Sequence, residues 1–298
     1  MASIPKQSSP RYSDGHPLDE VHYLESKIIL KGDRFTSVDS FTDFAKLVRR
    51  AADDVDIDFS RKGFKDALPR IREVLFLDTA DFRLYNNAFI LRRRLTYEHG
   101  FAVGPPEFVF KFRHPDLQIS AAVDVRPRLR GPYEIKFKAE ALPLKDQLGG
   151  MRLLYSHNVE FALGRDRNAK STSMANLMQI FPPLRSLHGS RRQAVELVNH
   201  TAVEEVLLDI GRLNFGKGIK AKANVAVWRT RGDERPLVGE FAFQCKFQRD
   251  DERHAVAMKR CERFFLSLQA AAKDWVALGT TKTGVVYRLK GNPPQAHE

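Results

Sequence analysis

The clearest pattern of apolar and polar positions lies between residues 74 and 95. Apolar residues fill 74–77, the pair Asp78-Thr79 ends that run, and a second apolar run closes on three consecutive arginines. This order predicts a strand, a turn and a second strand. Because side chains alternate between the two faces of a strand, Ile90, Arg92 and Arg94 are expected to share one face.

Further segments show the same alternation. Residues 21–30 place Tyr23, Glu25 and Lys27 on one face, and residues 108–113 place Lys111 and Arg113 opposite three phenylalanines. Such alternation predicts β-strands. The other predicted strands are 133–138, 194–199, 202–210, 219–231 and a strand that starts at 240. The alternation alone favours a sheet with one solvated face; in a closed barrel the polar face would line the lumen instead.

Two segments show helical spacing, and others lack a regular pattern. Apolar residues recur three or four positions apart in 38–52 and in 253–278, which predicts two helices. The mixed residues 53–70 predict a loop, and the irregular stretch 142–189 predicts a partly helical insertion. Residues 1–19 are expected to form a disordered N-terminal tail and 291–298 a C-terminal tail, which leaves a single domain at 20–290.

Composition narrows the class of protein without choosing a function. The chain has 298 residues and a formal net charge of +12, which indicates anionic partners: phosphates, nucleic acid or a membrane surface. Its two cysteines, Cys245 and Cys261, form no CxxC pair, so we expect a reducing, cytoplasmic location without a disulfide scaffold. No apolar run approaches about 18 residues, so no membrane span is expected.

Several familiar motifs are incomplete. Residues 211–218 nearly spell a phosphate-binding P-loop, but Gly218 stands where that loop needs Ser or Thr, and a turn between strands is the preferred interpretation. The nine histidines show no metal-ligand spacing. Because no nucleophile motif of a known type occurs either, covalent catalysis has no candidate.

Three short motifs resemble those of a known family. They are the strand ending in Phe76-x-Asp78-Thr79 before Leu-Arg-x-Arg at 91–94, the pair Glu25-x-Lys27, and Tyr287-Arg288-Leu289. Together they resemble the signature of the CYTH family, the triphosphate tunnel metalloenzymes, which includes thiamine triphosphatase and class IV adenylate cyclase. The resemblance implies an α+β fold built on an eight-stranded antiparallel β-barrel with flanking helices. It also implies a lumen that holds a triphosphate among basic side chains and divalent metals among carboxylates.

The resemblance further implies a set of site residues. Glu25, Arg92 and Lys111 would act in catalysis, and Glu25, Glu134 and Glu240 would hold Mg²⁺ or Mn²⁺. The residues expected to bind phosphates are Lys27, Arg92, Arg94, Lys111, Arg113, Lys136, Lys138, Lys246, Lys282 and Arg288. The arginine pair suits this role, because alternate residues of a strand project roughly 7 Å apart, about the span of adjacent phosphates, and each guanidinium offers a fork of donors.

The resemblance predicts metal-dependent hydrolysis of a linear triphosphate or polyphosphate: inorganic triphosphate, or a nucleoside or thiamine triphosphate. A cyclase would use the same site residues, and the sequence does not distinguish cyclisation from hydrolysis. Tyr23 replaces the family's first glutamate, and Ala242 and Gln244 stand where further carboxylates are usual. These departures support an alternative, a module that binds polyphosphate or nucleotide without turnover. A nucleic-acid-binding protein is the third hypothesis, and it predicts affinity that falls steeply with salt.

Overall fold

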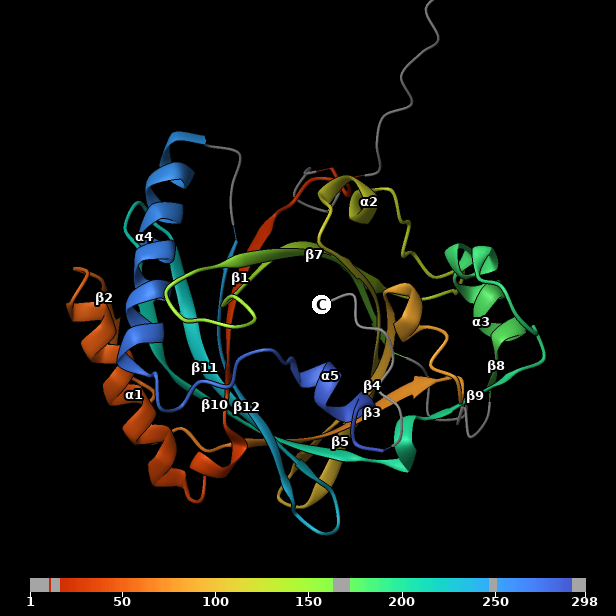
Figure 1. Cartoon of the computed structure of the whole chain (residues 1–298), viewed down its shortest axis with the longest axis horizontal. Helices are drawn as coiled ribbons and strands as arrows, with labels where there is room; N and C mark the ends of the chain where they lie inside the picture. Colours follow the sequence, from red (N-terminus) through yellow and green to blue (C-terminus); the bar gives the residue numbers. More distant parts are fainter. Residues whose placement is uncertain (1–10, 12–16, 163–171, 247–250, 291–298) are drawn as a thin grey trace, which may run out of the picture.

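The computed structural model describes residues 11, 17–162, 172–246 and 251–290. Most of the two expected tails, residues 1–10, 12–16 and 291–298, lies outside the described residues, so the domain limits stay a prediction. In the part of the chain that the structure describes, nine strands close into a barrel (Figure 1). They are β1 (Tyr23–Leu30), β3 (Arg70–Asp78), β4 (Phe89–Glu98), β5 (Phe101–His114), β6 (Tyr133–Leu142), β7 (Arg152–Ala162), β10 (Val203–Asn214), β11 (Lys220–Thr230) and β12 (Pro236–Lys246).

The ring closes through pairing of strands that are far apart in the sequence. Its order is β10, β11, β12, β1, β6, β7, β5, β4 and β3, and β3 pairs back with β10. Every pair is antiparallel except β1 with β6, which is parallel. Three short strands lie outside the ring: β2 (Asp58–Ser60), β8 (Thr172–Ser173) and β9 (Ala194–Leu197).

Helices cover the outside of the barrel and one of its openings (Figure 1). The α-helices are α1 (Val38–Asp53), α2 (Leu117–Ala121), α3 (Met174–Ile180), α4 (Asp251–Ala271) and α5 (Lys282–Tyr287). Short 3-10 turns are η1 (Gly32–Arg34), η2 (Tyr85–Asn87), η3 (Pro182–Ser186) and η4 (Val198–His200). Helices α1 and α4 pack side by side on one flank, α3 lies on the opposite flank, and α5 lies across the ring (Figure 1). No helix in the described ranges combines the length and the apolar character that a membrane crossing requires.

Two hydrophobic clusters lie between the barrel wall and the helices. On the α1 and α4 flank, the rings of Phe44 and Phe241 are 5.7 Å apart, and those of Phe243 and Phe264 are 5.6 Å apart. On the α3 flank, Phe110 and Phe181 stack at 3.9 Å. The phenylalanines of β5 and β12 therefore pack outward, and the charged face of these strands is left for the lumen.

A third hydrophobic cluster fills one end of the lumen itself. It joins Ile29, Phe76 and Ile90 from the wall to Trp228 and Tyr287, and the last of these lies on α5. We call this cluster the apolar floor. Because α5 packs into it, the lumen is closed on this side and its polar part is confined to the remainder of the barrel.

The expectation of a barrel with flanking helices is confirmed, but the number of strands is wrong. The ninth strand is β7, which lies between β5 and β6 in a stretch that was expected to be an insertion. On its outward face, the polar residue His157 stands between Tyr155 and Val159, ahead of Phe161. This buried histidine obscured the alternation of apolar and polar positions along the strand. In the described part of that stretch, β8, α3 and η3 lie outside the barrel as expected. The prediction of a purely antiparallel barrel is wrong at the β1–β6 pair.

Two smaller predictions concern connections. The segment 53–70 was expected to be a loop, but it contains β2, which pairs with β10. The incomplete P-loop is a tight turn between β10 and β11, which confirms the interpretation preferred from the sequence. The N–H of Phe215 donates to the carbonyl of Ile219 at 2.9 Å. Gly216 and Gly218 have φ of 81° and 82° there, a region in which glycine is favoured.

Candidate functional site

A buried carboxylate shapes the turn between β3 and β4. Asp78 is 2% exposed, and its oxygens accept hydrogen bonds from the backbone N–H groups of Thr79, Leu84 and Tyr85 at 2.7, 2.8 and 2.9 Å. The hydroxyl of Tyr287 donates a further bond at 3.2 Å. Because these donors span the whole turn, Asp78 holds the conformation from which β4 starts and thereby its register against β3.

This register decides which arginines of β4 enter the lumen. Arg92 lies opposite Phe76 of β3 and, with Arg94, lines an internal cavity. Arg93 takes the other face, where its Nη1 lies 2.8 Å from Oε1 of Glu73. The expectation that Arg92 and Arg94 share a face is therefore confirmed.

The polar part of the lumen is a cavity of about 260 Å³. Among the described residues, eight cationic side chains and five carboxylates line it, an excess of three positive charges. The cations are Lys27, Arg72, Arg92, Arg94, Lys111, Arg113, Lys138 and Lys282. The carboxylates are Glu25, Glu140, Glu160, Glu205 and Glu240. Such an excess inside a closed wall creates a site for an anion.

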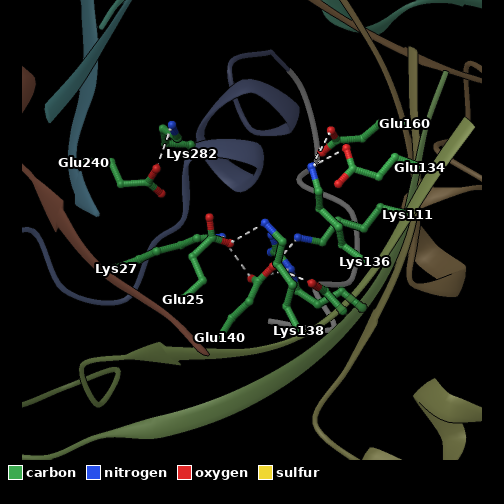
Figure 2. Close-up of polar contacts among 12 residues, drawn as sticks. Glu25, Lys27, Lys111, Glu134, Lys136, Lys138, Glu140, Glu160, Glu240 and Lys282 are labelled. Atoms are coloured by element: carbon green, nitrogen blue, oxygen red, sulfur yellow. Dashed lines mark hydrogen bonds and ion pairs between the residues drawn. The ribbon is translucent and has the colours of Figure 1, made fainter. Parts of the chain in front are cut away.

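Glu140 is the centre of one group of charges, which Figure 2 shows in the lower part of the view. Lys27 Nζ and Arg113 Nε each lie 3.3 Å from its Oε2, and Lys111 pairs with its Oε1. The hydroxyl of Ser156 also donates to Oε1 at 2.6 Å. We call Glu140 with Lys27, Lys111 and Arg113 the Glu140 cluster. Burial raises the pKa of Glu140, but these cations outweigh it and hold the pKa well below its ordinary value.

Glu25 extends this group on the neighbouring strand. Its Oε2 lies 2.8 Å from Nζ of Lys27 and 3.5 Å from Nζ of Lys138. Burial raises the pKa of Glu25, whereas Lys138 and Lys27 lower it by more, so the carboxyl is ionised at neutral pH. Glu25 and Glu140 occupy paired positions on the parallel strands β1 and β6, so two ionised carboxylates lie side by side.

A second group of charges surrounds Glu205 on β10. This side chain is 3% exposed, and its carboxylate accepts from Nε1 of Trp228 at 2.9 Å and from Nε of Arg72 at 2.6 Å. Lys282 of α5 lies 3.4 Å from Glu205 and 2.7 Å from Glu240, with its Nζ 4.8 Å from the centre of the Trp228 ring. These contacts tie α5 to the wall of the cavity.

Arg92 differs from every other cation that lines the cavity. Among the described residues it has neither a hydrogen bond nor an ion pair, and its Nε is buried without a partner. Burial and the neighbouring Arg94 lower the pKa of Arg92 to about 9, so the guanidinium is still protonated at neutral pH. A half-buried guanidinium without a counter-ion is costly, and it is a ready site for an anion.

The structure brings most of the expected site residues together. Those that line the cavity are Glu25, Lys27, Arg92, Arg94, Lys111, Arg113, Lys138, Glu240 and Lys282. Four others do not line it. Lys136 lies between Glu134 and Glu160 at 3.0 and 2.9 Å, and the Glu134 side chain is 61% exposed. Lys246 lies 5.8 Å from the ring of Tyr23, and Arg288 follows the end of α5.

Sequence reasoning missed several residues of the cavity. Glu140 continues the phase of residues 134, 136 and 138 on β6, so the alternation could have identified it. Glu160 and Asn158 belong to β7, which was not expected to be a strand. Asn158 is 5% exposed, and its Oδ1 has no hydrogen-bond partner in the described part of the chain. Nothing in the sequence pointed to Arg72 or assigned a role to Glu205.

The metal that the resemblance implies can be tested against these side chains. In the described ranges, no group of three or more histidine, cysteine, aspartate or glutamate residues could hold a metal ion. Mg²⁺ is commonly bound by only one or two carboxylates, with water and substrate phosphates completing its shell. The ionised pair Glu25 and Glu140 fits that requirement, although both are paired with lysine.

No protein-family model and no curated protein sequence matches this chain. Similar solved structures include a candidate adenylyl cyclase from Hippeastrum described as having a dominant triphosphatase activity, 13% identical at a TM-score of 0.40, covering 92% of this chain and 98% of that one. A candidate adenylate cyclase from Bacillus halodurans is 13% identical at a TM-score of 0.35, covering 83% of this chain and 90% of that one. A third candidate adenylate cyclase, from Vibrio parahaemolyticus, is 9% identical at a TM-score of 0.37, covering 89% of this chain and 98% of that one. At these scores the similarities carry no argument about activity.

Proposed function

We propose that this chain is a CYTH-type protein that binds a linear triphosphate or polyphosphate in its barrel and hydrolyses it with a divalent metal. The observation that carries the proposal is Arg92, a cation of the cavity without any counter-ion among the described residues. A linear phosphate chain would supply that counter-ion and could extend from Arg92 to the cations on neighbouring strands.

The size of the cavity supports a phosphate chain as the group that is held. Pockets for drug-sized ligands usually measure roughly 300–1,000 Å³. The cavity of about 260 Å³ lies below that range. We therefore expect the phosphates to enter the lumen, while any nucleoside or thiamine portion would stay near the opening.

The arrangement of charges suits phosphoryl transfer. Arg92, Arg94 and Lys111 would bind the phosphates and stabilise the charge that develops on the transferred group. Held by Glu25 and Glu140, with Glu240 as a further candidate ligand, Mg²⁺ or Mn²⁺ would supply charge neutralisation and an activated water. The exposed Glu134 is left out of this ligand set because it does not line the cavity.

Phosphate release tests the hydrolytic part of the proposal. We would measure release from inorganic triphosphate and from ATP with Mg²⁺, with Mn²⁺ and with a chelator. We expect metal-dependent release that falls at least about 100-fold in Glu25→Ala, since removal of one key electrostatic group costs about that much. Glu134→Ala, which removes an exposed carboxylate, is the control and should keep the activity. Release that is unaffected by the chelator would contradict a metal-dependent mechanism.

Binding of triphosphate tests the role of Arg92. Charged hydrogen bonds contribute roughly 1.5–3 kcal/mol, so Arg92→Ala should weaken triphosphate binding about 10- to 150-fold in calorimetry. Arg93→Ala removes a neighbouring arginine that faces away from the cavity and should bind as the unaltered protein does. Equal losses in both variants would show that the anion binds outside the lumen.

One observation favours a second candidate, a module that binds polyphosphate without turnover. The carboxylates Glu25 and Glu140, which would hold the metal, are both paired with Lys27. A metal must therefore compete with an internal ammonium group, which lowers its affinity. Clear triphosphate binding without any phosphate release would favour this candidate. The nucleic-acid hypothesis draws no comparable support from this site, because its eight cations line an internal cavity rather than an outer face of the barrel.

A further inference from the structure

Helix α5 is too short to hold its own position. It has six residues, and isolated helices of fewer than about 12–15 residues are marginal in water. Its first residue, Lys282, contacts Glu205 and Glu240 at the wall of the cavity, and Figure 2 shows the pair with Glu240. Whatever fixes α5 against the barrel therefore also fixes the ammonium group of Lys282.

Asn199 of η4 holds the other end of α5. Its Nδ2 donates hydrogen bonds to the carbonyl oxygens of Val286 and Tyr287 at 2.7 and 3.0 Å. Carbonyl groups in the last turn of a helix lack partners within that helix, and a side-chain amide offers two N–H donors on one nitrogen. Asn199 thus completes the hydrogen bonding of the last turn of α5 and links that turn to η4.

The segment that carries Asn199 has an unusual backbone. Asn199 and His200 both have φ of 52°, a left-handed conformation that is unfavourable for most residues and that asparagine tolerates better than most. Such conformations persist where the surrounding structure fixes them, and they are frequent at functional sites. The segment continues into β10, which carries Glu205, so one stretch of chain contacts both ends of α5.

We infer that Asn199 is a positioning residue, which places Lys282 in the cavity through its hold on α5. This inference rests on the proposed function, in which Lys282 is one of the cations expected to bind the phosphates. Asn199 itself does not line the cavity, so it acts on a bound triphosphate through α5 rather than by contact. The bond from Tyr287 to Asp78 and the apolar floor also hold α5, so we expect variants of Asn199 to fold.

The test is a double-mutant cycle on triphosphate binding. Inorganic triphosphate is titrated by calorimetry, with a chelator and at constant ionic strength, into the unaltered protein, Asn199→Asp, Lys282→Ala and the double variant. Lys282→Ala removes a cation and leaves Glu205 and Glu240 without it, so binding should weaken about 10- to 150-fold.

Asn199→Asp keeps the size of the side chain and tolerates the left-handed backbone, but it replaces the donor with an acceptor. Loss of the two hydrogen bonds should weaken triphosphate binding at least about 5-fold. The double variant should bind as Lys282→Ala does, because the effects of residues that act through one network are not additive. Losses that add in the double variant, or unaltered binding by Asn199→Asp, would overturn the inference.

His200→Asp is the matched control. It introduces the same charge at the next position, which has the same φ, but the His200 side chain is exposed. This control should bind triphosphate as the unaltered protein does, and a loss equal to that of Asn199→Asp would overturn the inference. If Asn199→Asp does not fold, Asn199→Gly removes the same donors without adding a charge and takes its place in the cycle, with the same expected results.

Hydrogen exchange provides a measurement that needs no triphosphate. The backbone amides of α5 should exchange at least about 5-fold faster in Asn199→Asp than in the unaltered protein or in His200→Asp. Unchanged exchange would show that Asn199 does not hold α5, which overturns the inference and leaves the proposed function intact. If the unaltered protein binds no triphosphate, the proposed function fails and the inference fails with it.

Discussion

Glu140 and Arg92 line the same cavity but differ in how their charge is balanced. Glu140 contacts three cations and a hydroxyl group, whereas Arg92 has no partner among the described residues. The first is held in place by the folded protein alone. The second lowers the stability of the folded protein, and a bound anion would relieve that cost. The comparison shows that the cavity contains both a part whose charged groups are paired within the protein and a part that is left open for an anion.

The difference follows from the position of each side chain in the barrel. Glu140 lies on β6, and its partners come from the adjacent part of the wall: β1 and β5. Arg92 lies beside Arg94 on the same face of β4 and next to β3, which carries Arg72, and no carboxylate of the described chain is within ion-pair distance. An unpaired charge of this kind lowers the stability of the folded protein. Such destabilising groups are typical of binding sites, where function requires them.

The largest expected effect concerns the stability of the protein without ligand. Glu140→Gln leaves buried cations without their carboxylate and should lower the free energy of unfolding by about 3–5 kcal/mol. Arg92→Met removes a charge that has no partner in the described part of the chain, so the free energy of unfolding should stay the same or rise. Urea unfolding of both variants checks this, with Glu134→Gln as an exposed control that should change it by less than about 1 kcal/mol. Similar losses in the first two variants would remove the distinction between the two regions.

A smaller effect extends the comparison to the apolar floor. Asp78 is buried there with hydrogen-bond donors but without an ion pair to any described residue, and burial raises its pKa to about 6 despite those donors. Its ordinary pKa is 3.8, so between these two values the folded protein binds more protons than the unfolded chain. Stability should therefore fall as the pH rises from about 4 to 6, opposite to the effect of Glu140, whose pKa is lowered.

The variant Asp78→Asn isolates this contribution. Relative to the unaltered protein, its free energy of unfolding should rise by roughly 2 kcal/mol between pH 4 and 7, because it lacks the titrating carboxyl. Urea unfolding of both proteins across this range measures the difference. A difference that is constant with pH would mean that Asp78 does not titrate there, and one that falls with pH would mean that its pKa is lowered.

The smallest expected effect concerns a cation outside the cavity. Lys136 is paired with Glu134 and Glu160 and does not line the lumen. Its removal should act on a bound triphosphate only through screened electrostatics, so Lys136→Ala should weaken binding by less than about 5-fold. Calorimetry beside Arg92→Ala gives the comparison. A loss as large as that of Arg92→Ala would place the phosphate chain nearer to β6 than proposed.

Much of the candidate site could be predicted from the sequence, because the alternation along a strand is local. The pairs Glu25 with Lys27, Arg92 with Arg94, and Lys111 with Arg113 each share an inner face as expected. Glu140 obeys the same rule on β6, and the missed strand β7 concealed Glu160. Local periodicity cannot reveal contacts such as Glu140 with Lys111, since these depend on which strands become neighbours.

The sequence by itself determined most strands of the ring, the two main helices and which of their residues share a face, because these depend on neighbours a few positions apart. Only the tertiary structure decided that the sheet closes, that β7 makes a ninth strand and that β1 pairs in parallel with β6. Closure turned the charged faces from solvent into a lumen. It also left Glu140 in contact with three cations and Arg92 without a carboxylate partner among the described residues, since the balance of charge depends on pairings between distant segments.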